Sequence, residues 1–152
     1  MTRYATLQAA AIALVQGMTR FVGHEDRVTA ADDRILDAGI PEAVIFFPGT
    51  FEEEEDEQSA SRRGYTMRVE LFVRIRDHDA DTFAAMIDLR DAIIELEELY
   101  PHLNLADVEE SLIRAEADPE WVFDTVGSGA VFLLQTLRWT AYRRTPLSGG
   151  VF

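Results

Sequence analysis

YTMRVELFVRIR, residues 65–76, is the stretch of this sequence that decides the fold. Its residues alternate between two faces, a period of two that predicts a β-strand of about twelve residues with one buried face. The predicted buried face consists of Tyr65, Met67, Val69, Leu71, Val73 and Ile75. The opposite face carries Arg68, Glu70, Phe72, Arg74 and Arg76. We expect the outward Phe72 to contact either another subunit or a helix of the same chain, because aromatic residues and arginine are favoured at protein interfaces.

The segment before this strand contains a second strand and a polar stretch. Ala43–Phe47 is a short apolar run that ends at Pro48 and Gly49, and it predicts a buried strand. Residues 51–64 are polar, and like charges repel within them, so we expect an exposed, mobile loop between two antiparallel strands. The candidate interaction residues of this loop are Glu52, Glu53, Glu54, Glu55, Asp56, Glu57, Arg62 and Arg63.

The remaining periodic segments complete an α+β domain. Helices are predicted for about 4–21, 29–38 and 82–100, and strands for about 108–117 and 130–144. The expected architecture is a single domain over residues 1–145, followed by a flexible tail over 146–152. Its sheet has about four strands, mainly antiparallel, and packs against the N-terminal helix and the long central helix.

The composition excludes several kinds of chemistry. The 152 residues carry 28 acids and 14 bases, a net charge of −14, and contain neither lysine nor cysteine. Disulfides, thiol catalysis, cysteine–zinc sites and Schiff-base lysines are therefore excluded. An acid excess of this size disfavours binding to bulk nucleic acid or anionic membranes. Gln8 and Gln16 interrupt the apolar N-terminal run, so we predict neither a signal peptide nor a membrane span.

A possible metal site precedes the central helix. Asp77, Asp79 and Asp81 have the spacing that begins a calcium-binding EF-hand loop, but Thr82 and Asp88 occupy the positions of its glycine and its bidentate glutamate. We favour a role in capping the helix and leave a weak divalent site as the alternative. His24, His78 and His102 have no partner histidine at ligand spacing, and no serine lies in a nucleophile elbow. We therefore predict no catalytic, cofactor-binding or metal residues and no enzyme activity.

The order of elements resembles the tail terminator, or tail-completion, proteins of long-tailed bacteriophages and gene transfer agents. The resemblance rests on the N-terminal helix, Ile40-Pro41 before the strand 43–47, the strand 65–76, the helix over 86–96 and the last strand with its Trp139-Thr140-Ala141-Tyr142-Arg143 end. It implies a homo-hexameric ring in the neck of a virion, assembled in the host cytoplasm. Such a ring caps the tail tube protein, joins a head-completion or connector protein, and lets DNA pass through its lumen without sequence-specific binding.

Two alternatives to this function remain open. One is an acidic, non-enzymatic adaptor whose 52–57 run binds a basic protein. The other is a different neck component, such as a head-completion protein.

Overall fold

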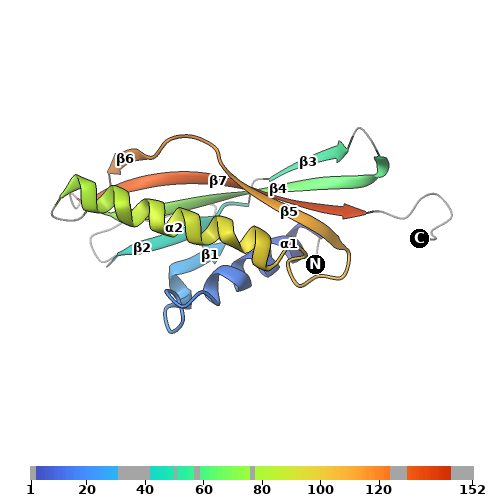
Figure 1. Cartoon of the computed structure of the whole chain (residues 1–152), viewed down its shortest axis with the longest axis horizontal. Coiled ribbons are helices and arrows are strands. Elements are labelled where there is room, and N and C mark those ends of the chain that lie inside the picture. Colours follow the sequence, from blue (N-terminus) through green and yellow to red (C-terminus); the bar gives the residue numbers. More distant parts are fainter. Residues whose placement is uncertain are drawn as a thin grey trace.

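The long strand β4 (Ser59–Arg74) lies at the centre of the computed structural model, which describes residues 3–30, 42–49, 51–56, 59–75, 78–123 and 130–144. The described residues form two α-helices and one sheet of seven strands, so the α+β class is confirmed (Figure 1). The helices are α1 (Arg3–Gln16) and α2 (Asp79–Leu99), and a short 3₁₀ helix covers Glu25–Arg27. The other strands are β1 (Val28–Ala30), β2 (Ala43–Phe47), β3 (Phe51–Asp56), β5 (Val108–Ala115), β6 (Glu120–Phe123) and β7 (Val131–Arg144).

The sheet is built on the antiparallel pair of β4 and β7, whose register runs from Arg62 opposite Arg144 to Arg74 opposite Phe132. The edge of β4 that faces away from β7 pairs with β2 and with β3. The edge of β7 that faces away from β4 pairs with β5 and with β6. Strand β1 adds to β2 in parallel, so the sheet is mixed. The predicted number of about four strands is therefore wrong. The four predicted strands are present as β2, β4, β5 and β7, and the three additional strands are short pieces at their edges.

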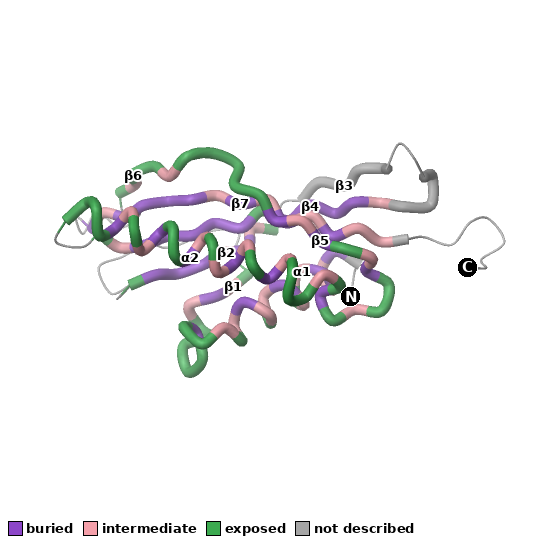
Figure 2. Tube along the Cα trace, viewed as in Figure 1, coloured by how far each residue is buried: buried purple, intermediate pink, exposed green. Residues whose placement is uncertain are grey.

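Both helices contribute to the main core, which lies on one face of the sheet. Figure 2 shows buried residues along β4, β7 and the sheet-facing sides of the helices. The helical part of the core is Tyr4, Leu7, Ala11 and Val15 from α1, with Met86, Leu89, Ile93 and Leu96 from α2. These residues recur at three- and four-residue steps and meet the odd-numbered side chains of β4, such as Met67 and Leu71. Burial of the Tyr4 ring in this core raises the pKa of its hydroxyl.

Two glutamines of α1 fasten the helix to the loops around it. The Gln8 side-chain amide donates to the carbonyl oxygens of Phe47 and Pro48, at 3.3 and 3.1 Å. The Gln16 amide donates to the carbonyl oxygens of Glu25 and Val28, at 3.2 and 3.1 Å. The same side chains that interrupt the apolar N-terminal run therefore satisfy backbone acceptors at the end of β2 and around the start of β1.

The helix predicted to begin at Thr29 is not formed there, because Thr29 pairs with Phe46 in the β1–β2 ladder. A β-branched residue next to an existing strand gains ladder hydrogen bonds that outweigh its use as a helix cap. Residues 31–41, which held the rest of that predicted helix, lie outside the described residues. The predicted C-terminal tail, 146–152, lies outside them as well.

Candidate interaction surfaces

The acidic run lies in a strand, so the predicted loop over 51–64 is wrong. Residues 52–56 belong to β3, which pairs with β4 in a hairpin that places Glu55 opposite Arg63. Strand β4 extends to Ser59 and offers its free edge to this segment. Ladder hydrogen bonds are made by the backbone, and successive residues of a strand point to opposite faces, so a run of acids is compatible with pairing. Glu57 lies outside the described residues.

The face of β4 that we predicted to be exposed is partly covered. Phe72 has no exposed surface and packs in a second apolar cluster with Val44, Phe132 and Leu134, on the face of the sheet opposite the main core. Phe46 makes an edge-to-face contact with its ring at 5.8 Å between centroids. Phe72 is therefore a core residue within the chain that packs on strand residues, so the expected contact with another subunit or with a helix is wrong. Among the other predicted interaction residues, Arg76 lies outside the described part of the chain.

Glu70 departs from the prediction in the same way, since only 3% of it is exposed. Its Oε2 lies 4.0 Å from Nε of Arg68, whose side chain is half exposed. Arg74, which lies four residues after Glu70 on the same strand, is half-buried. Of the outward residues of β4 that the sequence singled out, Arg68 is the one that the structure leaves most open.

Arginines stand directly opposite one another in the sheet. Arg63 pairs with Arg143, and Arg68 pairs with Arg138, which in turn pairs with Arg114 on its other side. We call Arg68, Arg138 and Arg114 the arginine row, because they occupy equivalent positions on three adjacent strands. Each alternates along its strand with a residue of the main core, so the three side chains start on the face opposite the helices, but the Arg114 guanidinium reaches Glu97 on α2. Like charges placed directly opposite each other destabilise a sheet.

Carboxylates offset part of this repulsion. The Arg114 guanidinium donates from Nη1 to Oε1 of Glu97 on α2, at 2.6 Å. The same Glu97 oxygen accepts the backbone N–H of Ile113 at 3.0 Å, so it also covers the outer edge of β5. At the other end of that edge, Nδ1 of His102 lies 2.8 Å from the carbonyl oxygen of Val108. Arg143, on the opposite face, forms an ion pair with Asp107.

Exposed apolar side chains gather where β6 meets the first turns of α2. The Phe83 and Trp121 rings make an edge-to-face contact at 5.5 Å between centroids. Phe123 is 78% exposed and Trp121 39% exposed. We call this set the aromatic patch, and its members are Ile75, Phe83, Ile87, Trp121 and Phe123. Figure 2 shows β6 and the segment before it as largely exposed.

The sheet register and the helix spacing place the members of the patch at one end of the sheet. Phe123 pairs with Val131, and the carbonyl oxygen of Val131 accepts the N–H of Ile75 on the other side, at 3.0 Å. Ile87 follows Phe83 by one turn of α2, and the exposed Asp79 precedes Phe83 by one turn. Sequence analysis missed it, because a four-residue strand has too few positions to show a period. Two aromatic residues within 120–123 were its only local signal.

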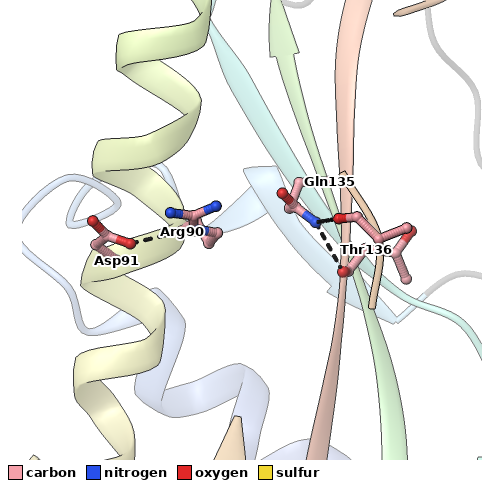
Figure 3. A network of polar contacts seen from close by, with 5 residues as sticks. Arg90, Asp91, Gln135 and Thr136 are labelled. Carbon is pink, nitrogen blue, oxygen red and sulfur yellow. Dashed lines mark hydrogen bonds and ion pairs between the residues drawn. The ribbon is translucent and has the colours of Figure 1, made fainter. Parts of the chain in front are cut away.

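Gln135 on β7 is buried on the sheet face that α2 covers, and Figure 3 shows it together with Arg90 on α2, which is half-buried. The Gln135 amide nitrogen donates to the carbonyl oxygens of Ala117 and Thr136, and Arg90 pairs with Asp91 at 3.2 Å. Within the described residues, the buried Gln135 Oε1, Trp139 Nε1 and Ser111 Oγ have no hydrogen-bond partner. They sit on the face of β5 and β7 that α2 covers, so they do not line an open surface.

Two observations on the described residues bear on small-molecule and metal binding. A cavity of about 70 Å³ is lined by Arg20, Glu42, Ala43, Val73 and Ala85. Small-molecule sites usually measure about 300–1,000 Å³. No cluster of three or more His, Asp or Glu side chains able to hold a metal is found among the described residues. Asp79 and Asp81 instead lie in the first turn of α2, where negative charge complements the helix dipole.

Comparisons with known proteins do not place the chain in a family. No family model matches it, and no curated protein matches it. Over the residues described, neither helix is both long and apolar enough to cross a bilayer. What the fold defines is an α+β domain with two distinct surface features, an aromatic patch and an arginine row, on opposite faces of one sheet.

Proposed function

We propose that this chain is a structural subunit that assembles into a ring, ends the growth of a phage tail tube and joins the tail to the head. The observation that carries the proposal is the aromatic patch. An exposed Phe123 beside a partly exposed Trp121 puts apolar surface in water, which is typical of a protein–protein interface. The resemblance in the order of elements to tail terminators supplies the kind of assembly.

The work of such a subunit is mechanical. Each copy binds its neighbours through identical contacts, and the closed ring then offers one face to the last tube ring and the other to the head. The net charge of −14 suits a ring through which DNA passes, because an acidic lumen does not retain phosphate. In this proposal the partners are further copies of the chain, the tube protein and a connector of the head.

An adaptor for a basic protein is the second candidate, and strand β3 favours it. Five consecutive acids lie on a strand that pairs with β4 along one edge. A basic extended segment could add to the other edge, with its charge attracted by the acids. Replacing Glu52–Asp56 by the corresponding amides would abolish binding of such a partner and leave ring assembly intact.

Electron microscopy and light scattering of the purified chain test the first proposal. We expect rings of six subunits with a mass of about 103 kDa, six times the 17.1 kDa of the chain. The rings should also cap tubes assembled from the tail tube protein that is the partner in this proposal. A chain that stays monomeric and leaves tube ends bare, but binds a basic protein through β3, would replace this proposal by the adaptor.

A further inference from the structure

We propose that the outer edge of β6 accepts an extended segment of a second protein, in which apolar residues alternate with lysine or arginine. This inference rests on the proposed function, in which the segment belongs to a tail or head protein that the ring joins. The added segment lies along β6 on the side away from β7. It packs its apolar residues on the aromatic patch and places its basic residues on the opposite face of the sheet.

The backbone groups of β6 alternate between β7 and the outer side of the sheet. On β7, the carbonyl oxygen of Val131 accepts the N–H of the residue that follows β4, and that of Thr136 accepts the N–H of Glu116. Successive residues of a strand bond in opposite directions, so odd-numbered residues of β7 bond toward β4 and even-numbered residues toward β5 and β6. Trp121 and Phe123 stand opposite odd-numbered residues of β7. Their N–H and C=O groups therefore point away from β7.

No strand among the described residues pairs with this outer side of β6. Strand β6 pairs with β7 alone, and Figure 1 shows it at the border of the sheet. The neighbouring edge of β5 differs, because Glu97 and His102 contact its backbone groups. An open edge beside exposed aromatic side chains is a template for pairing, which folded proteins usually cover. Such an edge is typical of a site at which a strand is added.

The side chains of β6 present two different faces to an added strand. Trp121 and Phe123 lie on the helix side of the sheet, where Trp121 packs edge-to-face on Phe83 and Phe123 is 78% exposed. Apolar side chains of an added strand cover these rings. Glu120 and Val122 lie on the opposite face, where the exposed Glu120 attracts a basic side chain. The added strand therefore needs apolar residues at every second position and a base between them.

The charge around the edge also selects a basic partner. Residues 115–123 contain Glu116, Asp118 and Glu120, all of them exposed, and no base. On the helix side, Asp79 is exposed in the first turn of α2. These carboxylates repel an acidic segment and attract lysine or arginine. A second copy of the chain is disfavoured as the occupant, because its own β6 brings further acids to the edge and its β3 consists almost entirely of acids.

Binding of synthetic peptides to the full chain tests the proposal. The probe is a capped peptide of about seven residues in which lysine and valine alternate. Isothermal titration calorimetry at about 150 mM salt, where attraction to the net charge is screened, should show saturable binding. A peptide of the same composition, with its lysines and valines in two blocks, has the same charge and should bind at least about tenfold more weakly. Replacement of every lysine by glutamate should abolish binding.

Peptides methylated on backbone nitrogens distinguish strand addition from attraction between charges. In a strand added to β6, the N–H groups of one set of alternate residues face β6 and those of the other set face away. Methylation of one set, the valines or the lysines, should therefore abolish binding, and methylation of the other set should change it by less than about twofold. Equal binding of the two methylated peptides overturns the inference.

Variants of the chain locate the site. Phe123→Ala should weaken binding of the alternating peptide at least about tenfold, whereas Leu99→Ala, at a residue 60% exposed at the end of α2, should leave it unchanged. Glu120→Lys should weaken binding about fivefold, and Glu98→Lys, at an exposed position of α2, should have a smaller effect. Circular dichroism verifies that all four variants fold. Unchanged binding by Phe123→Ala overturns the inference.

The remaining outcomes separate this inference from the proposed function and from the adaptor. Binding that is lost when Glu52–Asp56 are replaced by amides, but kept in Phe123→Ala, assigns the peptide to β3 and overturns the inference. A peptide that dissociates rings into single chains also overturns it, because the occupant of β6 is then a second copy. Rings that cap tail tubes, with no peptide bound at up to about 1 mM, overturn the inference and leave the proposed function standing. Peptide binding at β6 by a chain that forms no ring and leaves tube ends bare supports the strand site and overturns the proposed function.

Discussion

A single glycine determines how the chain leaves α1. Gly23 has φ of +84°, in the left-handed region that side chains rarely adopt, and its N–H donates to Oε1 of Glu25 at 3.2 Å. The bond from the backbone N–H of Glu25 itself and, second, this bond from Gly23 lower the pKa of the Glu25 carboxyl. Gly23 therefore sets the direction in which the chain turns toward β1, and its N–H favours the charged form of the Glu25 carboxyl.

Substitution of Gly23 tests this conformational requirement. Gly23→Ala should lower the free energy of unfolding by about 1 kcal/mol, because a Cβ there meets no atom within 4 Å and only the backbone conformation resists it. Gly17→Ala is the control. Its φ is ordinary and the added Cβ lies 3.4 Å from the Ala13 carbonyl oxygen, so we expect a change between zero and a gain of about 0.5 kcal/mol. Urea denaturation of both variants measures the difference, and equal losses would contradict the argument.

At the scale of elements, the outer edge of β5 is protected by side chains. Glu97 of α2 accepts the Ile113 N–H and binds Arg114, and the His102 ring contacts the Val108 carbonyl oxygen. A strand edge left open is a template for pairing with another chain, so these contacts act against aggregation as well as for stability.

Glu97→Ala should lower the free energy of unfolding by about 1–3 kcal/mol, because it removes a charged acceptor from a partly buried N–H and from a guanidinium. It should also increase light scattering on heating, since the β5 edge is then free. Glu98→Ala removes the same charge from the neighbouring, exposed position of α2 and should change stability by less than about 0.5 kcal/mol. Similar losses in the two variants would show that helix charge, and not the edge contact, is responsible.

The elements that could be predicted from sequence are those with enough residues to show a period. Strands β4 and β7 alternate over more than ten residues, and α2 presents apolar side chains over five turns. Strand β1 has three residues and β6 four, too few for a pattern. Strand β3 consists almost entirely of acids, whose low strand propensity is overridden by the free edge of β4 beside it. That edge is a tertiary feature and cannot be seen in the local sequence.

The residues of the candidate surfaces could be predicted from the sequence only in part. Alternation placed Arg68 on an exposed face, and the structure confirms it, but it placed Phe72 and Glu70 there too. Whether an outward residue is covered depends on its neighbours across the sheet, such as Leu134 and Val44 beside Phe72. These neighbours are set by the register between strands, which the sequence of one strand does not determine. The arginine row needed the register of three strands to be seen at all.

At the scale of the whole molecule, two electrostatic effects oppose each other. The excess of 14 negative charges destabilises the folded chain through self-repulsion, which acts over long distances and is screened by salt. Local ion pairs such as Arg114–Glu97 stabilise it, and salt weakens them as well. Exposed pairs contribute only about 0–1 kcal/mol each, so we expect the long-range repulsion to dominate.

The melting temperature should therefore rise with salt. Between about 10 and 150 mM NaCl the Debye length falls from about 30 to about 8 Å, and we expect an increase of about 2–4 °C, equivalent to about 1 kcal/mol for a chain of this size. A variant with the six acids of residues 52–57 replaced by amides has a net charge of −8 in place of −14 and should show a smaller increase. Both chains are compared by calorimetry at one dilute concentration, so that assembly contributes equally. A melting temperature that falls with salt would mean that the ion pairs of α2, β5 and β7 outweigh the net repulsion.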